Sequence, residues 1–361
     1  MIARGVIAGL ESRGFEVTTI PTGRSLVQLA SMTTALADWD AYTHLRYLSM
    51  LKQARPDCVL GFYDYDSTLV RACANLRIPY VASIHIYWPV CPVGTLYIDG
   101  SGICPGPGLS RCLRHMSGTI PPLRLPMNLT WLPAPLGLGV FLKNRNRVPN
   151  LRKAAAIIVP SEAISVILQK VGLSNITVVP NGLDLDAHPS ELWRAGPKKI
   201  LFASGAASER KGVGHFVELA RRLSSSHPDA VFAATSFAGS GPVRGLGRLA
   251  HAEVLREMRE SYAVVAPSLW NEPFSVTIQE AMACGKAVVA YDAGGNAEML
   301  GGTGVIVPRG DLSALCSSVE ALLRDEERAI RLGAQARARA EEMFPARKMI
   351  DGYARVLQSV A

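Results

Sequence analysis

The sequence predicts an α/β protein with two doubly wound parallel sheets, each in a domain of its own. Short apolar runs alternate with segments of helical length, such as Ile2–Glu11, Glu162–Val171 and Val213–Leu223. The runs are continuously apolar, as expected for parallel strands that are buried on both faces. The 361 residues also exceed what a single hydrophobic core usually serves. Repeated strand–helix units over this length predict two Rossmann-like domains.

The predicted strands form two series. The first is Phe15–Ile20, Cys58–Tyr63, Tyr80–His85, Ala155–Val159 and Ile176–Val179, and the second is Ile200–Ser204, Ala230–Thr235, Tyr262–Ala266, Ala287–Tyr291 and Val305–Val307. Between them, Asn181–Pro197 is polar, contains Pro and Gly, and lacks periodicity, which places the domain boundary there. Open α/β sheets bind ligands outside the carboxyl ends of their strands, so we expect a cleft between the two domains to hold the site.

The first domain opens with a helix, where a doubly wound domain normally opens with a strand. We therefore expect its first strand to be missing, which corresponds to about 15–25 residues of a longer gene. The N-terminal residues have no apolar signal-peptide region. The longest apolar stretch, Leu129–Leu142, is broken by two Pro and two Gly and is too short to span a bilayer. These features predict a cytoplasmic protein, either free or peripheral on the inner face of the membrane.

The net charge limits the kinds of binding partner, and the cysteine count indicates the redox compartment. The net charge is +8, and residues 1–190 carry 17 Lys and Arg against 11 Asp and Glu. A basic first half favours phosphates or an acidic membrane surface, although an ordinary, mildly basic enzyme explains it equally well. No nucleic-acid-binding motif accompanies the charge, so we expect no nucleic-acid partner. Seven cysteines, an odd number, favour a reducing compartment over a disulfide framework.

The segment Asn271–Leu300 (NEPFSVTIQEAMACGKAVVAYDAGGNAEML) is the most informative one. Ser275 is the expected N-cap of a helix that runs to Cys284, and Gly285 is the expected C′ residue. The start of a helix has free N–H groups and a partial positive charge, which suit a diphosphate. Glu272 precedes this start and Glu280 follows it, so two carboxylates flank the phosphate position and are available to bind the hydroxyls of a sugar and a ribose. By spacing alone, two surface glutamates on an amphipathic helix are the favoured interpretation.

The same segment closely resembles the donor-site signature of glycosyltransferase family 4, the retaining enzymes of GT-B fold. Four other segments resemble the family too: Val179–Asp184, Ile200–Gly212, Ala238–Pro242 and Met343–Ala361. The resemblance implies two Rossmann-like domains that face a cleft. Residues 1–183, completed by a C-terminal helix at 345–361, are then the acceptor-side domain. Residues 184–344 are the domain that binds the nucleotide-sugar donor.

The resemblance also implies roles for individual residues. Glu272 is expected to contact the sugar hydroxyls and Glu280 the ribose, while Lys211 pairs with the diphosphate and takes the place of a metal, so that catalysis requires no cofactor. The remaining residues of the expected donor site are Arg210, Gly205, Gly241, Phe274, Ser275 and Val276. The family's usual arginine is Ala206 here, and Arg210 is its only neighbouring substitute.

His85 follows a predicted strand, at a position where the family often has a histidine close to the sugar and the acceptor. The family's neighbouring aspartate is Ile86 in this sequence. By itself, a lone histidine at a strand end is more often structural. We expect a catalytic-site role without general-base action, because in retaining enzymes of this fold the departing phosphate takes the acceptor proton.

A Pro- and Gly-rich insertion, Pro89–Met116, contains three cysteines and a histidine: Cys91, Cys104, Cys112 and His115. Three thiolates and one imidazole suit a tetrahedral structural zinc site, and a subset of the family has a similar pattern. Unligated reduced thiols are the alternative. The other cysteines (Cys58, Cys73, Cys284, Cys316) are expected in the core. Residues 120–153 are apolar and basic, which suits peripheral contact with anionic lipids or a buried connector.

The sequence therefore predicts a retaining glycosyltransferase that moves a sugar from a UDP- or GDP-sugar to the hydroxyl of a glycan or lipid-linked acceptor, in polysaccharide or glycolipid synthesis. Ala206 and Ile86 leave open a catalytically weakened or inactive nucleotide-sugar-binding homologue. A nucleotide-sugar epimerase on the same scaffold is a further alternative, although the glutamate pair favours transfer. The residues do not identify the base, the sugar or the linkage.

Overall fold

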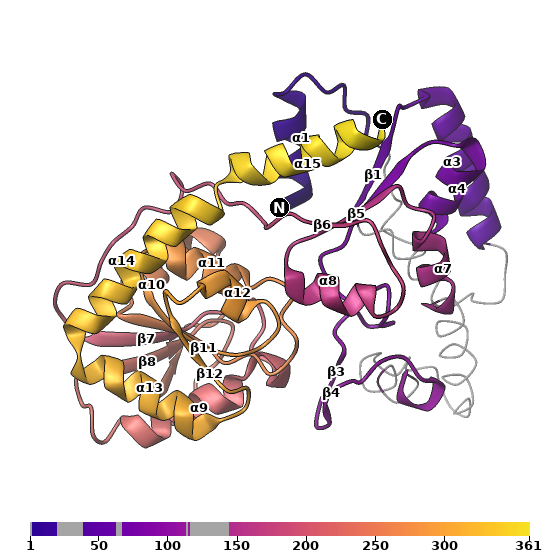
Figure 1. Cartoon of the computed structure of the whole chain (residues 1–361). Helices are drawn as coiled ribbons and strands as arrows, with labels where there is room; N and C mark the ends of the chain where they lie inside the picture. The colour runs from indigo at the N-terminus through magenta and orange to yellow at the C-terminus, as the bar shows by residue number, and fades with distance from the viewer. Residues whose placement is uncertain (1, 20–38, 63–66, 113–114, 116–143) are drawn as a thin grey trace. The chain divides into compact units, whose positions relative to one another are not determined.

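The structure is a computed structural model of the chain, and it describes residues 2–19, 39–62, 67–112, 115 and 144–361. The chain divides into two compact units (Figure 1). Unit 1 comprises Met1–Ile98, Cys104–Val179 and Ile350–Ala361, and unit 2 comprises Asp99–Ile103 and Pro180–Met349. Each unit contains a parallel sheet with helices packed on it.

The sheet of unit 1 has the strand order β1-β2-β5-β6, and all of its pairings are parallel. The strands are β1 (Val59–Phe62), β2 (Tyr80–Ser83), β5 (Ala156–Val159) and β6 (Ile176–Val178). The helices are α1 (Ile2–Glu11), α3 (Trp39–Ala54), α4 (Thr68–Leu76), α7 (Arg147–Leu151) and α8 (Glu162–Gln169). In the predicted insertion, β3 (Tyr97–Ile98) pairs with β4 (Gly102–Ile103).

The sheet of unit 2 has the order β12-β11-β10-β7-β8-β9 and is again parallel. Its strands are β7 (Lys198–Phe202), β8 (Ala230–Ala234), β9 (Val243–Gly245), β10 (Ala263–Ala266), β11 (Ala287–Tyr291) and β12 (Val305–Val307). Its helices are η1 (Glu209–Lys211, 3-10), α9 (Val213–Leu223), α10 (His251–Arg259), α11 (Val276–Ala283), α12 (Asn296–Leu300), α13 (Leu312–Arg324) and α14 (Glu326–Met343).

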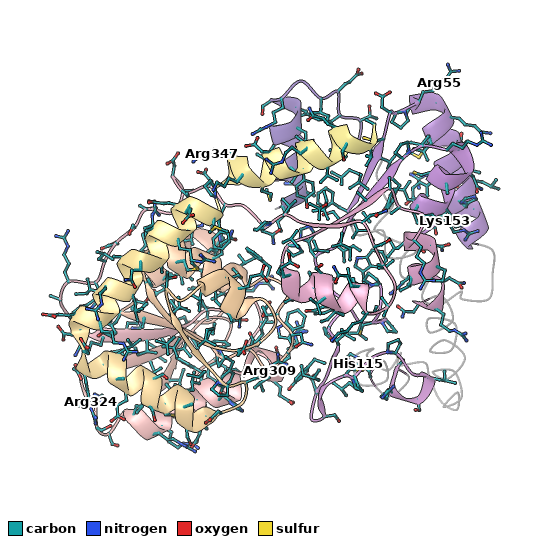
Figure 2. The ribbon with its side chains drawn as sticks, in the orientation of Figure 1. Arg55, His115, Lys153, Arg309, Arg324 and Arg347 are labelled. Atoms are coloured by element: carbon teal, nitrogen blue, oxygen red, sulfur yellow. The ribbon has the colours of Figure 1, made fainter. Side chains whose placement is uncertain are left out.

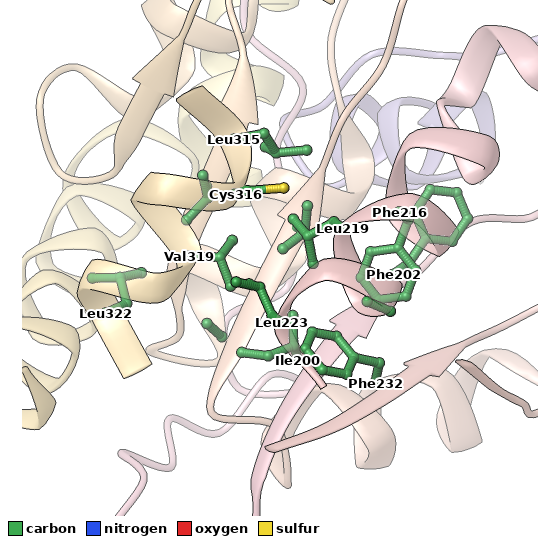
Figure 3. Close-up of a cluster of buried hydrophobic side chains, with 14 of the residues drawn as sticks. Ile200, Phe202, Phe216, Leu219, Leu223, Phe232, Leu315, Cys316, Val319 and Leu322 are labelled. Atoms are coloured by element: carbon green, nitrogen blue, oxygen red, sulfur yellow. The ribbon is translucent and has the colours of Figure 1, made fainter. Parts of the chain in front are cut away.

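The central strands of unit 2 are buried on both faces, as their continuous apolar runs predict: β10 and β11 throughout, and β7 from Ile200 to Phe202. Ile200 and Phe202 of β7 join the cluster formed with α9 and α13 (Figure 3), whereas Leu201 between them joins the cluster formed with α11 and α14 on the other face. Side chains along a strand alternate between faces, so a strand that lies between two layers of helices has no polar face.

The final helix, α15 (Ala346–Val360), packs its last three turns within unit 1. It approaches α1 and the end of β6 closely: an added Cβ at Gly9 would lie 2.3 Å from the Ile350 side chain, and one at Gly352 would lie 2.7 Å from Val179. Arg13 and Asp351 form an ion pair beside the first contact. Gly9 and Gly352 therefore allow the last helix to pack closely against α1 and the end of β6.

Three sequence expectations need correction. Phe15–Ile20 is not a strand over its described part, Phe15–Thr19, whose side chains are all at least partly exposed; a parallel strand needs burial on both faces. The sequence did not predict β9 or the β3–β4 pair, which are only two or three residues long. Arg147, part of the expected basic surface, is buried and donates hydrogen bonds to the Trp88 carbonyl and to Asn144.

Most of the expected membrane-contact segment, residues 120–143, lies outside the described residues. Among the described helices, none combines the length and the apolar character that crossing a bilayer requires.

Candidate functional site

The reversal of strand order in unit 2 marks the place for a ligand. From β7, the chain proceeds to β8 and β9 on one side, and then returns to β10, β11 and β12 on the other. In open α/β sheets, ligands bind at the carboxyl edge where the order reverses. The loops that follow β7 and β10 meet at this edge. They carry Lys211 and Glu272, two of the predicted site residues.

Lys211 and Glu272 form an ion pair, with 2.7 Å between Nζ and Oε2. The same oxygen accepts hydrogen bonds from Trp270 Nε1 at 2.8 Å and from Ser268 Oγ at 3.1 Å. Glu272 is 4% exposed, and the Lys211 ammonium lies 5.1 Å from the centre of the Trp270 ring. Three donors and one ring thus fix the carboxylate and the ammonium in one arrangement, which is what a preorganised charged site requires.

Two glycines permit the close approaches that bring this pair together. Gly212 follows Lys211 with φ +80°, and an added Cβ would lie 1.9 Å from the Pro267 carbonyl oxygen. Gly294 has φ +62°, and an added Cβ would lie 2.3 Å from the Glu272 carbonyl oxygen. A side chain at Gly212 would push apart the loops that follow β7 and β10, and one at Gly294 would push the loop after β11 away from Glu272. These segments therefore pack closely only because the two positions lack side chains.

The helix that separates the two glutamates forms as predicted. Ser275 caps α11 by accepting a hydrogen bond from the Ile278 N–H at 3.3 Å, and Gly285 follows the C-cap with φ +71°. At its start, Thr277 Oγ1 donates to the Ala203 carbonyl, just after β7. The positive end of α11 therefore adjoins the loop that carries Gly205 and Lys211.

Glu280 lies inside α11 and is 7% exposed. Its Oε1 accepts a hydrogen bond of 2.6 Å from Nε2 of His251, the first residue of α10. The His251 ring in turn packs edge-on against His188, with 6.3 Å between ring centres. Glu280 therefore has a histidine environment, unlike Glu272.

The other predicted donor-site residues have mixed placements. The Arg210 guanidinium stacks on the Trp270 ring at 5.4 Å, so it shares an aromatic platform with Lys211. Phe274 is buried against Phe344. The remaining three, Gly205, Gly241 and Val276, are exposed. Ala206, in the place of the family's arginine, is exposed in the same loop as Lys211.

In unit 1, His85 lies at the end of β2 in a hydrogen-bonded group. Its Nε2 is 2.9 Å from Ser83 Oγ and 3.4 Å from the Tyr353 hydroxyl, and these two hydroxyl oxygens are 2.7 Å apart. The Phe62 ring stacks with both the imidazole and the Tyr353 ring. Burial lowers the pKa of His85 to about 4, so the imidazole is neutral at physiological pH. It can exchange hydrogen bonds there but does not act as an acid.

The four residues of the predicted zinc set all belong to unit 1, and Figure 2 labels His115. Burial opposes ionisation of Cys91, but hydrogen bonds from His115 and from backbone groups outweigh it and lower the thiol pKa. Burial raises the pKa of Cys112, and the charges of Cys91 and Cys104 raise it further. All three are buried and reduced. The zinc site stays a prediction.

Family models match both units. The model described as "Glycosyltransferase Family 4" matches residues 3–187, and the model described as "Glycosyl transferases group 1" matches residues 197–325. The chain belongs to glycosyltransferase family 4.

Relatives and solved structures agree with this assignment. The chain is 31% identical to a glycogen synthase of Mycobacterium tuberculosis over 194 residues, which are 48% of this chain and 46% of that protein. It is 29% identical to a phosphatidyl-myo-inositol mannosyltransferase of Mycobacterium leprae, over 52% of this chain and 55% of that protein. The chain thus spans about half the length of these curated relatives.

The fold is that of the GT-B glycosyltransferases. The crystal structure of HepE from Anabaena in complex with UDP matches 88% of this chain and 82% of that one, with a TM-score of 0.63 at 17% identity. Two Rossmann-like domains are therefore established, as the sequence predicted.

Sequence reasoning missed several residues of this candidate site. Trp270 and Ser268 precede Glu272 in the same loop, and a polar loop after a predicted strand was the available signal. Tyr353 lies on the final helix, 270 positions from Ser83. His188 and His251 come from segments far from Glu280 in the sequence, and no local pattern links them.

Proposed function

We propose that the chain transfers a sugar, with retention of configuration, from a nucleotide diphosphate sugar to an acceptor hydroxyl, and that unit 2 binds the donor. The observation that carries the proposal is the Lys211–Glu272 pair at the strand-order reversal, beside the start of α11. This edge combines a cation, helix N–H groups and a fixed carboxylate within one unit. A diphosphate that is joined to a polyol requires these same three features.

The diphosphate binds between Lys211 and the N-terminus of α11. The Lys211 ammonium has three N–H donors and gives one of them to Glu272, so the others remain for phosphate oxygens. When the bond from the sugar to the diphosphate breaks, negative charge accumulates on the leaving group. The ammonium and the helix start stabilise that charge, so the reaction proceeds without a metal ion.

The two glutamates divide the rest of the donor between them. All donors to the Glu272 carboxylate in the described structure converge on Oε2, which leaves Oε1 to accept from a sugar hydroxyl. Glu280 lies one to two turns further along α11, at about 1.5 Å per residue, and accepts from the ribose hydroxyls. The donor therefore lies along α11, with its diphosphate at the helix start.

His85 serves the acceptor side of the reaction. Its neutral imidazole exchanges hydrogen bonds with hydroxyl groups, as it already does with Ser83. The departing phosphate takes the acceptor proton, so no general base is assigned. The relatives bear the names of one glycan-forming and one lipid-modifying enzyme, which supports a glycan or lipid-linked acceptor. HepE is solved with UDP, which makes UDP-sugars the first donors to test, before GDP-sugars.

The test combines donor binding with product analysis. Thermal unfolding is measured with UDP, GDP, ADP and their common sugars; a ligand at a hundredfold excess over its Kd stabilises the fold by about 2.7 kcal/mol. The best donor is then incubated with glycan and lipid acceptors, and NMR determines the anomeric configuration of the product. Retention supports the proposal. If no nucleotide stabilises the chain, the donor assignment is wrong, and an inverted product contradicts the retaining mechanism.

A second candidate, a nucleotide-sugar binder without turnover, is favoured by Ala206, which leaves the loop beside Lys211 without the family's arginine. It predicts stabilisation by a nucleotide sugar but no release of nucleoside diphosphate, with or without acceptors.

A further inference from the structure

His188, His251 and Glu280 form a group of potential metal ligands in unit 2. One ligand atom from each residue lies within 4.8 Å of those from the other two. His188 and Glu280 are 6% and 7% exposed, while the His251 side chain is 45% exposed. Two imidazoles and a carboxylate form a familiar zinc ligand set that leaves one coordination position open.

The His188 ring is oriented as a metal ligand would be. Its Nδ1 lies 2.6 Å from the Asp184 carbonyl oxygen, and because a carbonyl only accepts, Nδ1 carries the proton. Nε2 then has a free lone pair. This atom is buried, and within the described part of the chain it has no hydrogen-bond partner. Metal-binding histidines generally donate their other ring N–H to a carbonyl or a carboxylate in this way.

The backbone that carries His188 is fixed against α11. Arg337 of α14 donates hydrogen bonds of 2.5 Å to the carbonyl oxygens of both His188 and Ala283. On either side, Gln279 Nε2 donates to the Asn181 carbonyl, and the Glu191 N–H donates to the Cys284 carbonyl. His188 and Glu280 are thus held on a common rigid support, and the partly exposed His251 is the ligand that is free to adjust.

From this arrangement we infer that His188, His251 and Glu280 bind a divalent transition-metal ion, preferentially Zn²⁺, and that the ion and the ribose of the donor compete for Glu280. The competition rests on the proposed function; the metal site does not. Ligand atoms about 2.05 Å from a tetrahedral ion are about 3.3 Å apart. Glu280 Oε1 and His251 Nε2 are 2.6 Å apart, so they move apart when the ion binds, while the ligand atoms that are more than about 3.3 Å apart move closer. Rotation of the His251 side chain allows both changes.

The ion takes the place of the proton in the hydrogen bond from His251 to Glu280. The carboxylate accepts from Nε2 of His251, so this nitrogen becomes a ligand only after its proton has moved to Nδ1 or into solvent. Glu280 then binds the ion and no longer accepts from ribose hydroxyls. Zn²⁺ at this site therefore inhibits donor binding, while the diphosphate position at Lys211 is left intact.

Titration calorimetry of the EDTA-stripped full-length chain with Zn²⁺ tests the site directly, without reference to transferase activity. His188→Asn keeps a donor toward the Asp184 carbonyl and removes the Nε2 ligand. His251→Gln keeps a donor toward Glu280 and removes the ligand. We expect a Zn²⁺ site that either substitution weakens at least tenfold, in addition to any site at the cysteine set. The matched control is His227→Gln, because His227 lies 3.6 Å from Glu320 and, among the residues that the structure describes, this pair belongs to no group of three ligands.

Co²⁺ in place of Zn²⁺ separates this site from the cysteine set, because thiolate ligands give intense near-ultraviolet absorption and imidazole and carboxylate ligands do not. The metal-site inference is overturned if both His variants bind Zn²⁺ as tightly as the unsubstituted chain, or if the bound Co²⁺ shows only thiolate absorption.

The experiment is repeated with saturating UDP, which is expected to weaken Zn²⁺ binding at least tenfold. Unchanged Zn²⁺ affinity in UDP that is shown to be bound overturns the competition. If UDP and the other nucleotides fail to bind at all, the proposed function fails and the metal result stands by itself.

Discussion

Glu272 and Glu280 belong to one motif, yet the structure surrounds them with different chemistry. Glu272 accepts from a lysine, an indole and a hydroxyl, of which the lysine brings a positive charge. Glu280 accepts from one imidazole, which is itself titratable and partly exposed. The first carboxylate is held in one arrangement. The second is open to exchange of its partner, either for a ribose or for a metal ion.

This difference predicts unequal consequences when each carboxylate or its partner is altered. The first site should carry the chemical step, because fixed charges act on a transition state only when they need no reorganisation. The second should control how tightly the donor binds. The following predictions test this difference between Glu272 and Glu280.

Replacing Glu272 has the largest expected effect. Glu272→Gln removes the negative charge that Lys211 faces and weakens the proposed hydrogen bond from the sugar hydroxyl. Turnover is expected to fall about 1000-fold, or about 4 kcal/mol of transition-state stabilisation. Release of nucleoside diphosphate measures it, and circular dichroism verifies the fold. Glu257→Gln, which breaks a comparable 2.8 Å ion pair with Lys199, is the control. A loss of less than tenfold in the Glu272 variant would refute the assigned role.

Lys211→Gln tests the other half of the same pair. We expect turnover to fall about 100-fold, because one donor to the leaving diphosphate loses its charge while the helix start remains. The matched variant is Lys199→Gln, another lysine with carboxylate partners in unit 2 but on strand β7 itself. Equal losses in the two variants would show that the effect reflects stability and not a contact with the diphosphate.

The next prediction concerns His85 of unit 1, whose imidazole is neutral at physiological pH. Burial lowers its pKa to about 4, whereas an unfolded chain titrates near 6.5, so between these values the unfolded state binds more protons. The free energy of unfolding therefore falls as the pH drops through this window. Above pH 6.5 the imidazole is neutral in both states, and His85 does not reduce the free energy of unfolding. At pH 5 it reduces that free energy by about 1.5 kcal/mol, a value that allows for the partial exposure of the ring.

Urea unfolding at pH 7 and pH 5 measures this loss in the parent chain and in His85→Gln. The variant should lose about 1.5 kcal/mol less than the parent over this interval. His215, whose pKa burial also lowers, is present in both proteins and cancels in the difference. The same pH dependence in both proteins would mean that His85 is not the group that titrates.

The smallest effect is expected at the partner of Glu280. In buffer with EDTA, His251→Ala removes the hydrogen bond that positions the carboxylate. The KM for the donor should rise about fivefold with little change in kcat, because a single such bond contributes about 1 kcal/mol. His251→Gln should restore most of the KM, since its amide donates from nearly the same place. A fall in kcat larger than the change in KM would place the chemistry at Glu280 and reverse the comparison.

Local signals predicted individual elements well. The bounds of α9 and the caps of α11 agree with the sequence, because a Ser at the N-cap and a Gly at C′ act within one helical turn. The segment Phe15–Ile20 misled, since its described part, Phe15–Thr19, belongs to no sheet and is at least partly exposed throughout. The short β9 was missed because three residues, one of them Arg244, do not form an apolar run.

The site was predicted in part. Glu272, Glu280 and Lys211 were found through their resemblance to a family, and the helix between the glutamates through its caps. The pairing of Lys211 with Glu272 joins residues 61 positions apart, and His251 lies 29 positions from Glu280. Neither separation corresponds to a repeat of helix or strand, so neither pair can be read from local spacing.

The α/β class, the two sheets and the capped helix beside the glutamates follow from the amino-acid order, because periodicity and capping depend on neighbours along the chain. The pairing of Lys211 with Glu272 and of His251 with Glu280 emerges only when the chain is folded. Buried apolar runs are nearly interchangeable, so their packing order determines which loops meet at the edge where the strand order reverses.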